Sequence, residues 1–253
     1  ATHNYVLSAE GGANVHNAKF VGTGYNDTFF ATAGTDTYNG GGGWESNSQH
    51  NTWKADGGRD IVDFKLSTVG IEADLSLTTA QNTKFNISTF NNIEGIAGSN
   101  FDDVIKGNSG NNEFEGRGGN DTFNIGQSGH DSLLYKLLNA ADATGGNGHD
   151  MVNGFTLGTW EGTADTDRID IRDLLQGSGY TGTADASYVN GVATLGYGSG
   201  NIMDYINVRV ENGSTIISVD RDGGGNSYNS TDLVTISGVQ TDLATLLANH
   251  QLL

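Results

Sequence analysis

The sequence predicts an all-β fold in which short strands and glycine-rich turns alternate along one coiled chain. Glycine supplies 39 of the 253 residues, about twice the average usage of ~7%. Hydrophobic residues make up only 35% of the chain, so we expect a thin, repetitive core. An acidic residue, a spacer and an apolar residue recur at intervals of nine. A fixed short period predicts stacked repeats, here a parallel β-roll or β-helix.

The nine-residue period is carried by acidic and amide side chains. Two runs keep it without interruption: Asp27, Asp36 and Glu45 in the first, and Asp103, Asn112 and Asp121 in the second. Asp131 follows after ten residues and Asp150 after nineteen more. The stretch 145–153 fits the pattern G-G-x-G-x-D-x-U-x, where U is a large apolar residue, at every specified place. The stretch 116–124 fits it with one glycine displaced.

Such a nonapeptide predicts six turn residues followed by three strand residues. Glycine best tolerates positive φ and close backbone approach in the turn, and the central apolar residue of the strand points inward. Because two nonapeptides complete one coil, residues eighteen apart should stack, Asp103 over Asp121 and Asp27 over Glu45. Stacked carboxylates repel unless a hard cation lies between them. Carboxylate and turn carbonyl oxygens together suit Ca²⁺ better than Zn²⁺ or Mg²⁺.

We therefore predict that several Ca²⁺ ions are held by the repeats. The metal-site residues predicted in the first repeat region are Gly22, Gly24, Asp27, Gly34, Asp36, Gly43, Glu45, Gly58 and Asp60. Those predicted in the second are Gly98, Asn100, Asp103, Gly107, Ser109, Gly110, Asn112, Gly116, Gly118, Gly119, Asp121, Gly129, Asp131, Gly145, Gly146, Asn147, Gly148 and Asp150. Ordinary turn chemistry in an all-β protein is the alternative, but the register over several copies favours calcium. Ala31 and Ala33 stand where glycine is expected, and Glu45 and Asn112 replace Asp, so sites there should be weak or empty.

Four regions follow from the pattern. Residues 1–64 form a first repeat region with an insertion at 40–57, residues 65–97 connect without glycine turns, and residues 98–153 form the main repeat block. Residues 154–253 form a β-rich cap over the open end of the coil. In the connecting region Ile71, Ala73, Leu75 and Leu77 alternate with polar residues, which predicts a half-buried strand.

Two short helices are expected among the strands. Leu133, Leu134, Leu137 and Leu138 follow Ser132 at helical spacing, which predicts a helical insertion over 132–141 with Ser132 as N-cap. In the cap we expect strands at 205–210, 215–219 and 233–236, and a helix over 242–249 capped by Thr241.

The run that begins with Asp220 and Asp222 is similar to the start of a calcium loop. It does not fit an EF-hand, because Gly224 and Thr231 stand at positions 5 and 12. It either binds Ca²⁺ through these two carboxylates or forms a hairpin turn.

Composition and missing motifs exclude several classes of function. Acidic residues outnumber basic ones 30 to 12, for a net charge of −18, which disfavours nucleic acid and anionic lipid as partners. Without cysteine there is no disulfide, thiolate metal site or cysteine nucleophile. No apolar run approaches the ~18 residues of a membrane span, so we expect no membrane insertion. Neither H-E-x-x-H nor G-x-S-x-G occurs, and we expect no enzymatic activity.

The nonapeptide and the tail together resemble the C-terminal region of large RTX adhesins that Gram-negative bacteria export by type I secretion. The tail segments that carry the resemblance are 167–175, 215–223 and 246–253. The resemblance implies an uncleaved C-terminal secretion signal, a chain that crosses the export channel unfolded, and folding on contact with external calcium. It also implies a secreted or cell-surface location, with calcium and the type I secretion machinery as partners.

Three functions fit the sequence. The first is a calcium-dependent folding and export module at the end of a surface adhesin, which we expect to be a monomer. The second is a module that binds a host or surface glycan or peptide through Trp44, His50 and Trp53 of the insertion. The third is the non-catalytic RTX part of a secreted enzyme.

Overall fold

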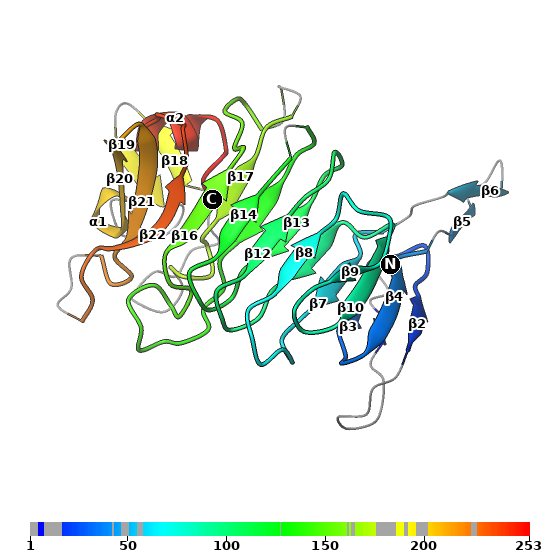
Figure 1. The fold of residues 1–253 in the computed structure, drawn as a ribbon. Helices are drawn as coiled ribbons and strands as arrows, with labels where there is room; N and C mark the ends of the chain where they lie inside the picture. The colour runs from blue at the N-terminus through cyan, green and yellow to red at the C-terminus, as the bar shows by residue number, and fades with distance from the viewer. Residues whose placement is uncertain are drawn as a thin grey trace.

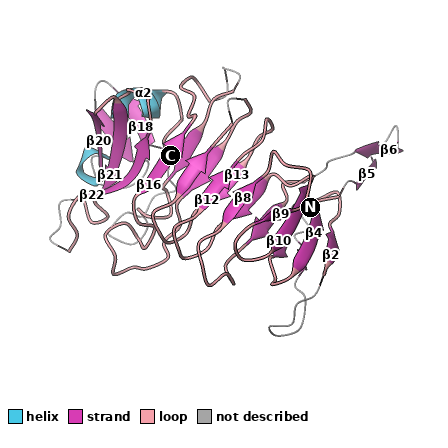
Figure 2. Cartoon of the chain, viewed as in Figure 1, coloured by secondary structure: helices cyan, strands magenta, loops and turns pink. Residues whose placement is uncertain are grey.

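Short parallel strands dominate the computed structural model (Figures 1 and 2). It describes residues 5–7, 17–41, 43–46, 51–54, 58–126, 128–160, 162, 165–175, 186–189, 192–195, 202–223 and 227–253. Two short helices, α1 (Ile202–Tyr205) and α2 (Leu243–Ala248), lie in the C-terminal part of these residues.

Two sheets of seven strands hold most of the chain. The first sheet is parallel throughout and runs β1 (Tyr5–Leu7), β3 (Asp27–Phe30), β7 (Ile61–Asp63), β11 (Gly95–Ala97), β13 (Glu113–Glu115), β15 (Ser132–Leu134) and β17 (Arg168–Asp170). The second sheet runs β20 (Ile206–Glu211), β21 (Ser214–Val219), β22 (Thr231–Ile236), β16 (Asp150–Asn153), β14 (Thr122–Asn124), β12 (Val104–Lys106) and β8 (Glu72–Asp74).

Smaller sheets complete the architecture. A four-stranded sheet runs β2 (Lys19–Val21), β4 (Thr35–Asn39), β10 (Ile87–Asn91) and β9 (Gln81–Asn82). Two hairpins are formed by β5 (Gly43–Ser46) with β6 (Asn51–Lys54) and by β18 (Ala186–Val189) with β19 (Val192–Leu195). In the tail, α1 precedes β20, and β22 pairs with β16, so the tail continues the second sheet.

Strand pairing follows the predicted period where the repeats are regular. Val104 pairs with Thr122 and Gly95 pairs with Glu113, each eighteen residues later. Consecutive strands from β11 to β16 alternate between the first and second sheets. This arrangement of parallel sheets is consistent with the predicted β-roll, although antiparallel pairs in the tail make the whole structure mixed.

The core is thin because each short strand contributes few inward side chains. Phe114 of β13 and Phe123 of β14 are both buried, and their ring centroids lie 6.0 Å apart between the two sheets. Fully burying a large apolar side chain is worth about 1.5–3 kcal/mol. Each coil therefore gains only a few such contributions, and repetition along the stack must supply the rest.

The predicted helix over 132–141 is wrong. Residues 132–134 form β15, where Leu133 is buried and pairs with Phe114 and Ile169 of the neighbouring strands. The hydroxyl of Ser132, the predicted cap, accepts a hydrogen bond from Arg168 Nε at 3.1 Å. Stacking in register with the neighbouring coils outweighs the helical spacing of the leucines, and Leu138 is left 42% exposed.

The other predicted elements are closer to the structure. Strands β20, β21 and β22 fall on the predicted tail segments, and α2 falls within 242–249. Its N-cap is Asp242 rather than Thr241, because the Asp242 carboxylate accepts a hydrogen bond from Thr245 N at 2.7 Å. No helix in the described part of the chain is long and apolar enough to cross a membrane.

The two regions that lack regular turns differ from expectation in detail. Around β8, Ile71, Ala73 and Leu75 are buried as predicted, whereas Leu77 is 42% exposed because it follows the strand in a turn. The insertion contains the β5–β6 hairpin, in which Trp44 pairs with Trp53 along the backbone. The side chains of these tryptophans, and the whole of His50, lie outside the described residues.

Candidate metal centre

A column of acidic and amide residues runs along the turns that lead into the first sheet. We call it the first column; its members are Asp27, Asp60, Glu94, Asn112, Asp131 and Asp167. Asp27 N donates to Asp60 Oδ1 at 2.8 Å, and Asp60 N donates to Glu94 Oε2 at 2.8 Å. Farther along, Asn112 N donates to Asp131 Oδ1 at 2.7 Å, and Asp131 N donates to Asp167 Oδ1 at 3.1 Å. Each of these carboxylates thus binds the backbone of the preceding coil.

A second column, formed by Asp103, Asp121 and Asp150, runs along the turns that lead into the second sheet. Ile71 N donates to Asp103 Oδ1 at 2.7 Å, Asp103 N to Asp121 Oδ1 at 2.8 Å, and Asp121 N to Asp150 Oδ1 at 2.8 Å. The predicted stacking of Asp103 over Asp121 is therefore present.

The predicted stacking of Asp27 over Glu45 is wrong, because Asp27 stacks on Asp60, thirty-three residues later. Glu45 and the preceding Gly43 lie in β5, whose antiparallel pairing with β6 takes this segment out of the parallel stack. The insertion therefore lengthens one coil and moves the next acidic residue of the stack to position 60.

Four turns bring the acidic or amide side chain against the backbone of the glycine five residues earlier. A Cβ on Gly116 would lie 2.0 Å from Asp121 Oδ2, and one on Gly98 would lie 2.2 Å from Asp103 Oδ2. The same relation joins Gly22 to Asp27 and Gly107 to Asn112. Glycine at this position is required for close approach, which explains its fixed offset in the sequence.

Several carboxylate oxygens of the columns are buried and have no hydrogen-bond partner. Among the described residues they include Asp27 Oδ1, Asp121 Oδ2 and Asp131 Oδ2. A buried polar atom without a partner costs about 1–3 kcal/mol, and more when it is charged. These oxygens can therefore accept a further ligand, either a proton or a cation.

Burial also changes the acidity of these groups. Desolvation raises the pKa of Asp121 to about 9, assisted by the charges of Asp150 and Asp103. Burial likewise raises the pKa of Asp131 to about 6 and those of Asp150 and Asp167 to about 7. Near neutral pH the folded columns require neutralisation by protons or by a metal ion.

The donor set fits a hard cation that takes backbone oxygens as well as carboxylates. Among the described residues, no three His, Cys, Asp or Glu side chains gather into one cluster, so side chains alone do not form a cage. The turns of successive coils touch, however: a Cβ on Gly148 would lie 1.9 Å from Gly119 O. One or two carboxylates with turn carbonyls form the mixed oxygen set that Ca²⁺ accepts.

The remaining predicted residues shape the turns. Gly24, Gly34, Gly58, Asn100, Ser109, Gly110, Gly118, Gly119 and Gly129 all lie at bends between strands. In the turn 145–148, Gly146 N donates to Asp142 Oδ1 at 3.1 Å and Gly148 N donates to Thr144 Oγ1 at 3.1 Å. The Asn147 amide donates to Lys136 O at 2.8 Å. Gly145 and its neighbours thus fold back on the 136–144 loop.

Asp36 has the sequence of a column residue but a different environment. Its carboxylate accepts hydrogen bonds from Ala18 N at 3.1 Å, Thr32 Oγ1 at 2.8 Å, Tyr38 OH at 3.0 Å and Asn86 Nδ2 at 3.3 Å. The protein itself therefore satisfies this buried carboxylate, and its need for a cation is lower than that of Asp121.

Asp220 and Asp222 lie in a turn after β21. Gly223 N donates to Asp220 O at 3.3 Å, and Ser227 N donates to Asp222 Oδ2 at 2.8 Å. Between the two carboxylates, Arg221 donates to Asp142 O at 2.7 Å and so ties this turn to the 136–144 loop. Asp222 Oδ1 is buried without a hydrogen-bond partner. The hydrogen bonds fit the hairpin-turn alternative, and calcium binding here stays a prediction.

Sequence reasoning missed a ladder of hydrogen bonds beside the columns, formed by residues that directly precede column residues. Arg59 N donates to Asn26 Oδ1, Asn120 N to Asp102 Oδ1 and His130 N to Asn111 Oδ1, each at 2.8 Å. His149 N continues the ladder by donating to Asn120 Oδ1 at 2.9 Å. The signal was present in the sequence as the pairs 26–27, 102–103, 111–112 and 120–121, each made of two Asp or Asn residues.

Comparison with known protein families supports the nine-residue repeat found in the sequence. A family model described as the RTX calcium-binding nonapeptide repeat, in four copies, matches residues 17–43 and 97–133. The chain thus contains RTX repeats, which bind Ca²⁺ in general and are typical of secreted bacterial proteins. The matched segments include Asp27, Asp36, Asp103, Asp121 and Asp131. No curated protein matches the chain.

Proposed function

We propose that this chain is a calcium-dependent folding module that ends a secreted, surface-associated adhesin. The observation that carries the proposal is the stack of buried carboxylates with unpartnered oxygens, best seen at Asp121 and Asp131. In the absence of a cation, these groups oppose folding near neutral pH, since burial raises the pKa of both.

Calcium would supply the charge that the columns lack. Asp103, Asp121 and Asp150 would contribute carboxylate oxygens in the second column, and Asp131 and Asp167 would contribute them in the first. Each ion would draw its remaining ligands from carbonyl oxygens of adjacent turns. Because the ions bind the folded columns and not the extended chain, binding free energy becomes folding free energy.

The same linkage suits export of an unfolded chain. A net charge of −18 and few core contacts per coil favour an unfolded state where calcium is scarce. Outside the cell, extracellular calcium modules commonly bind at ~10⁻⁴–10⁻³ M, so folding would follow transport. The type I secretion machinery as partner, the Gram-negative cell surface as location and the adhesin as parent rest on the resemblance of the tail, and the proposal assigns this chain no catalytic step.

Far-ultraviolet circular dichroism during a calcium titration tests the proposal. The chain is first treated with a chelator, and magnesium is titrated in parallel as the control. We expect a cooperative gain of β-signal with calcium alone. A spectrum that is already rich in β-structure in chelator, and that calcium does not change, would contradict the proposed folding switch.

A further inference from the structure

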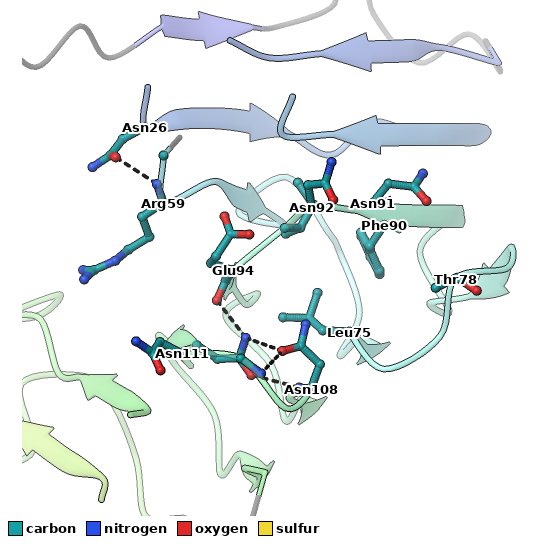
Figure 3. A pocket seen from close by; sticks show the side chains of 14 residues that line it. Asn26, Arg59, Leu75, Thr78, Phe90, Asn91, Asn92, Glu94, Asn108 and Asn111 are labelled. Atoms are coloured by element: carbon teal, nitrogen blue, oxygen red, sulfur yellow. Dashed lines mark hydrogen bonds between the residues drawn. The ribbon is translucent and has the colours of Figure 1, made fainter. Parts of the chain in front are cut away.

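The stack of turns beside the first sheet is interrupted after β10. The turn between β12 and β13 spans residues 107–112, whereas residues 92–94 alone connect β10 to β11. So short a connection does not fill the space that a full glycine turn occupies. It leaves a cavity of about 980 Å³, which we call the notch. Figure 3 shows this opening, which reaches the upper end of the usual size range for ligand sites.

Polar side chains from separate turns surround the notch. Asn26 and Arg59 come from the turns before β3 and β7, and Asn108 and Asn111 come from the turn before β13. Figure 3 places these two pairs on opposite sides, with Glu94 between them. An asparagine amide offers both donors and an acceptor, so the two walls can bind a ligand that presents groups of both kinds.

The ladder fixes two of these amides and leaves their NH₂ groups available. Asn26 Oδ1 accepts from Arg59 N and Asn111 Oδ1 accepts from His130 N, each at 2.8 Å. Within the described residues, no hydrogen bond uses the NH₂ group of either side chain. The walls therefore hold preorganised donors, which lowers the entropy lost when a ligand binds.

The charged groups at the notch already have partners within the protein. Arg59 forms an ion pair with Glu113, and Glu94 Oε2 accepts a hydrogen bond from Asp60 N at 2.8 Å. The net charge of −18 further disfavours an anionic ligand. Among the described residues, no cluster of three metal-ligating side chains lies here or elsewhere. An uncharged ligand fits this lining better than an ion does.

A peptide fits the notch poorly. A bound peptide extends a sheet at a free strand edge or inserts its side chains into apolar pockets. Here β4 pairs with the whole of β10, and β9 covers the other edge at Ile87 and Ser88, so the free edge is only three residues long, at 89–91. Strand β11 is paired on both sides, by β7 and β13. The apolar residues at the notch are already buried, with Phe90 and Ile93 each 3% exposed.

We propose that the notch binds a neutral oligosaccharide, with the asparagine amides contacting its hydroxyl groups. A sugar offers donors and acceptors on every side, needs no strand edge and carries no charge. The proposal does not depend on calcium-driven folding, since the notch arises from the length of the 92–94 connection.

The test is an array of uncharged glycans probed with the calcium-saturated chain, followed by calorimetry with each trisaccharide that binds. Thr78→Trp places an indole at the edge of the notch, and Thr79→Trp is the matched control at an exposed neighbour that does not line it. We expect Thr78→Trp to abolish binding and Thr79→Trp to retain it. Asn91→Ala, which removes an amide from the lining, should weaken binding by about threefold to tenfold.

Circular dichroism confirms that each variant is folded before binding is measured. If Thr78→Trp does not fold, the affinity of Asn91→Ala decides the outcome: weaker binding supports the proposal, and unchanged binding overturns it. Failure of the wild-type chain to bind any uncharged glycan overturns the proposal, and so does equal binding by Thr78→Trp and Thr79→Trp when both are folded. Either result leaves the calcium titration, and with it the proposed folding function, unaffected.

Discussion

Asp36 and Asp121 occupy the same position of the repeat, and both are buried. Their surroundings satisfy the buried carboxylate to different extents. Asp36 accepts hydrogen bonds from Tyr38 OH, Thr32 Oγ1 and Asn86 Nδ2. Asp121 is also buried, but its Oδ2 atom has no hydrogen-bond partner. The difference shows that a repeat can keep its acidic residue and still lose its need for a metal ion.

Two sequence positions distinguish the turns of these residues. Two residues after the acid, Tyr38 supplies a hydroxyl where Phe123 supplies none. Five residues before it, Ala31 stands where Gly116 makes close contact with the Asp121 carboxylate. An alanine in place of the expected glycine, together with a tyrosine in place of phenylalanine, thus marks the turn in which the protein itself supplies the hydrogen-bond donors for the buried carboxylate.

Calcium withdrawal should produce the largest difference between the two regions. We expect amides of β12, β14 and β16, beside the second column, to lose hydrogen-exchange protection by about a thousandfold in chelator, the equivalent of roughly 4 kcal/mol of linked binding. Amides of β4 and β10 should lose less, because Asp36 already has its donors. Exchange measured by mass spectrometry with and without calcium checks this, and equal loss in both regions would contradict the comparison.

Replacing single acids should separate the two regions next most strongly. Asp121→Asn keeps the shape of the side chain and removes its charge, so we expect the calcium midpoint to rise by about tenfold, or about 1.4 kcal/mol. The matched variant Asp36→Asn should leave the midpoint unchanged. It should instead lower the free energy of unfolding in saturating calcium by about 1.5–3 kcal/mol, since four donors lose a charged acceptor.

Calcium titration by circular dichroism and urea unfolding in saturating calcium measure these two effects separately. A shift of the calcium midpoint in Asp36→Asn as large as that in Asp121→Asn would show that both turns hold the ion.

In chelator, acid should partly replace calcium. The folded-state pKa of Asp121 is about 9, against the ordinary value of 3.8, so the folded chain binds more protons than the unfolded chain between these values. Stability of the metal-free fold should therefore be highest near the lower value and fall as pH rises. Circular dichroism in chelator from pH 4.5 to 8, about the range over which these carboxylates lose protons, checks the direction. A metal-free β-signal that increases with pH would contradict it.

The sequence predicts the regular part of this structure well, because local rules and packing agree there. From Asp103 to Asp121, period, turn glycines and inward apolar residues all specify one register, and the strands pair as expected. Prediction failed where a segment departs from the period. The leucines after Ser132 have helical spacing, but Leu133 is held in β15 by the coils on either side.

Prediction of the candidate site is limited in the same way, where the chain departs from the nine-residue period. The position of each acid within its repeat is visible in the sequence, but its neighbour in the stack depends on the length of the intervening coil. Asp27 lies against Asp60 rather than Glu45. The sequence predicted an insertion at 40–57, but the nine-residue spacing still placed Glu45, which lies inside it, in the stack. The hydrogen bonds that satisfy Asp36 include one from Asn86, fifty residues away, and no local pattern predicts that contact.

Tyr38→Phe should give the smallest effect, and it tests the difference between Asp36 and Asp121 most directly. The change removes one of the donors to Asp36 and turns the residue into the one found at position 123, while the ring stays stacked on Phe20 at 5.1 Å. Losing a hydrogen bond to a buried carboxylate costs about 1–2 kcal/mol of unfolding free energy. Because Asp36 Oδ2 then keeps only the donors of Thr32 and Asn86, part of this loss should be recovered by calcium at concentrations that already saturate the wild-type chain. Urea unfolding at two saturating calcium concentrations measures both quantities, and a loss that no added calcium reduces would mean that the turn at Asp36 lacks the carbonyl oxygens to hold an ion.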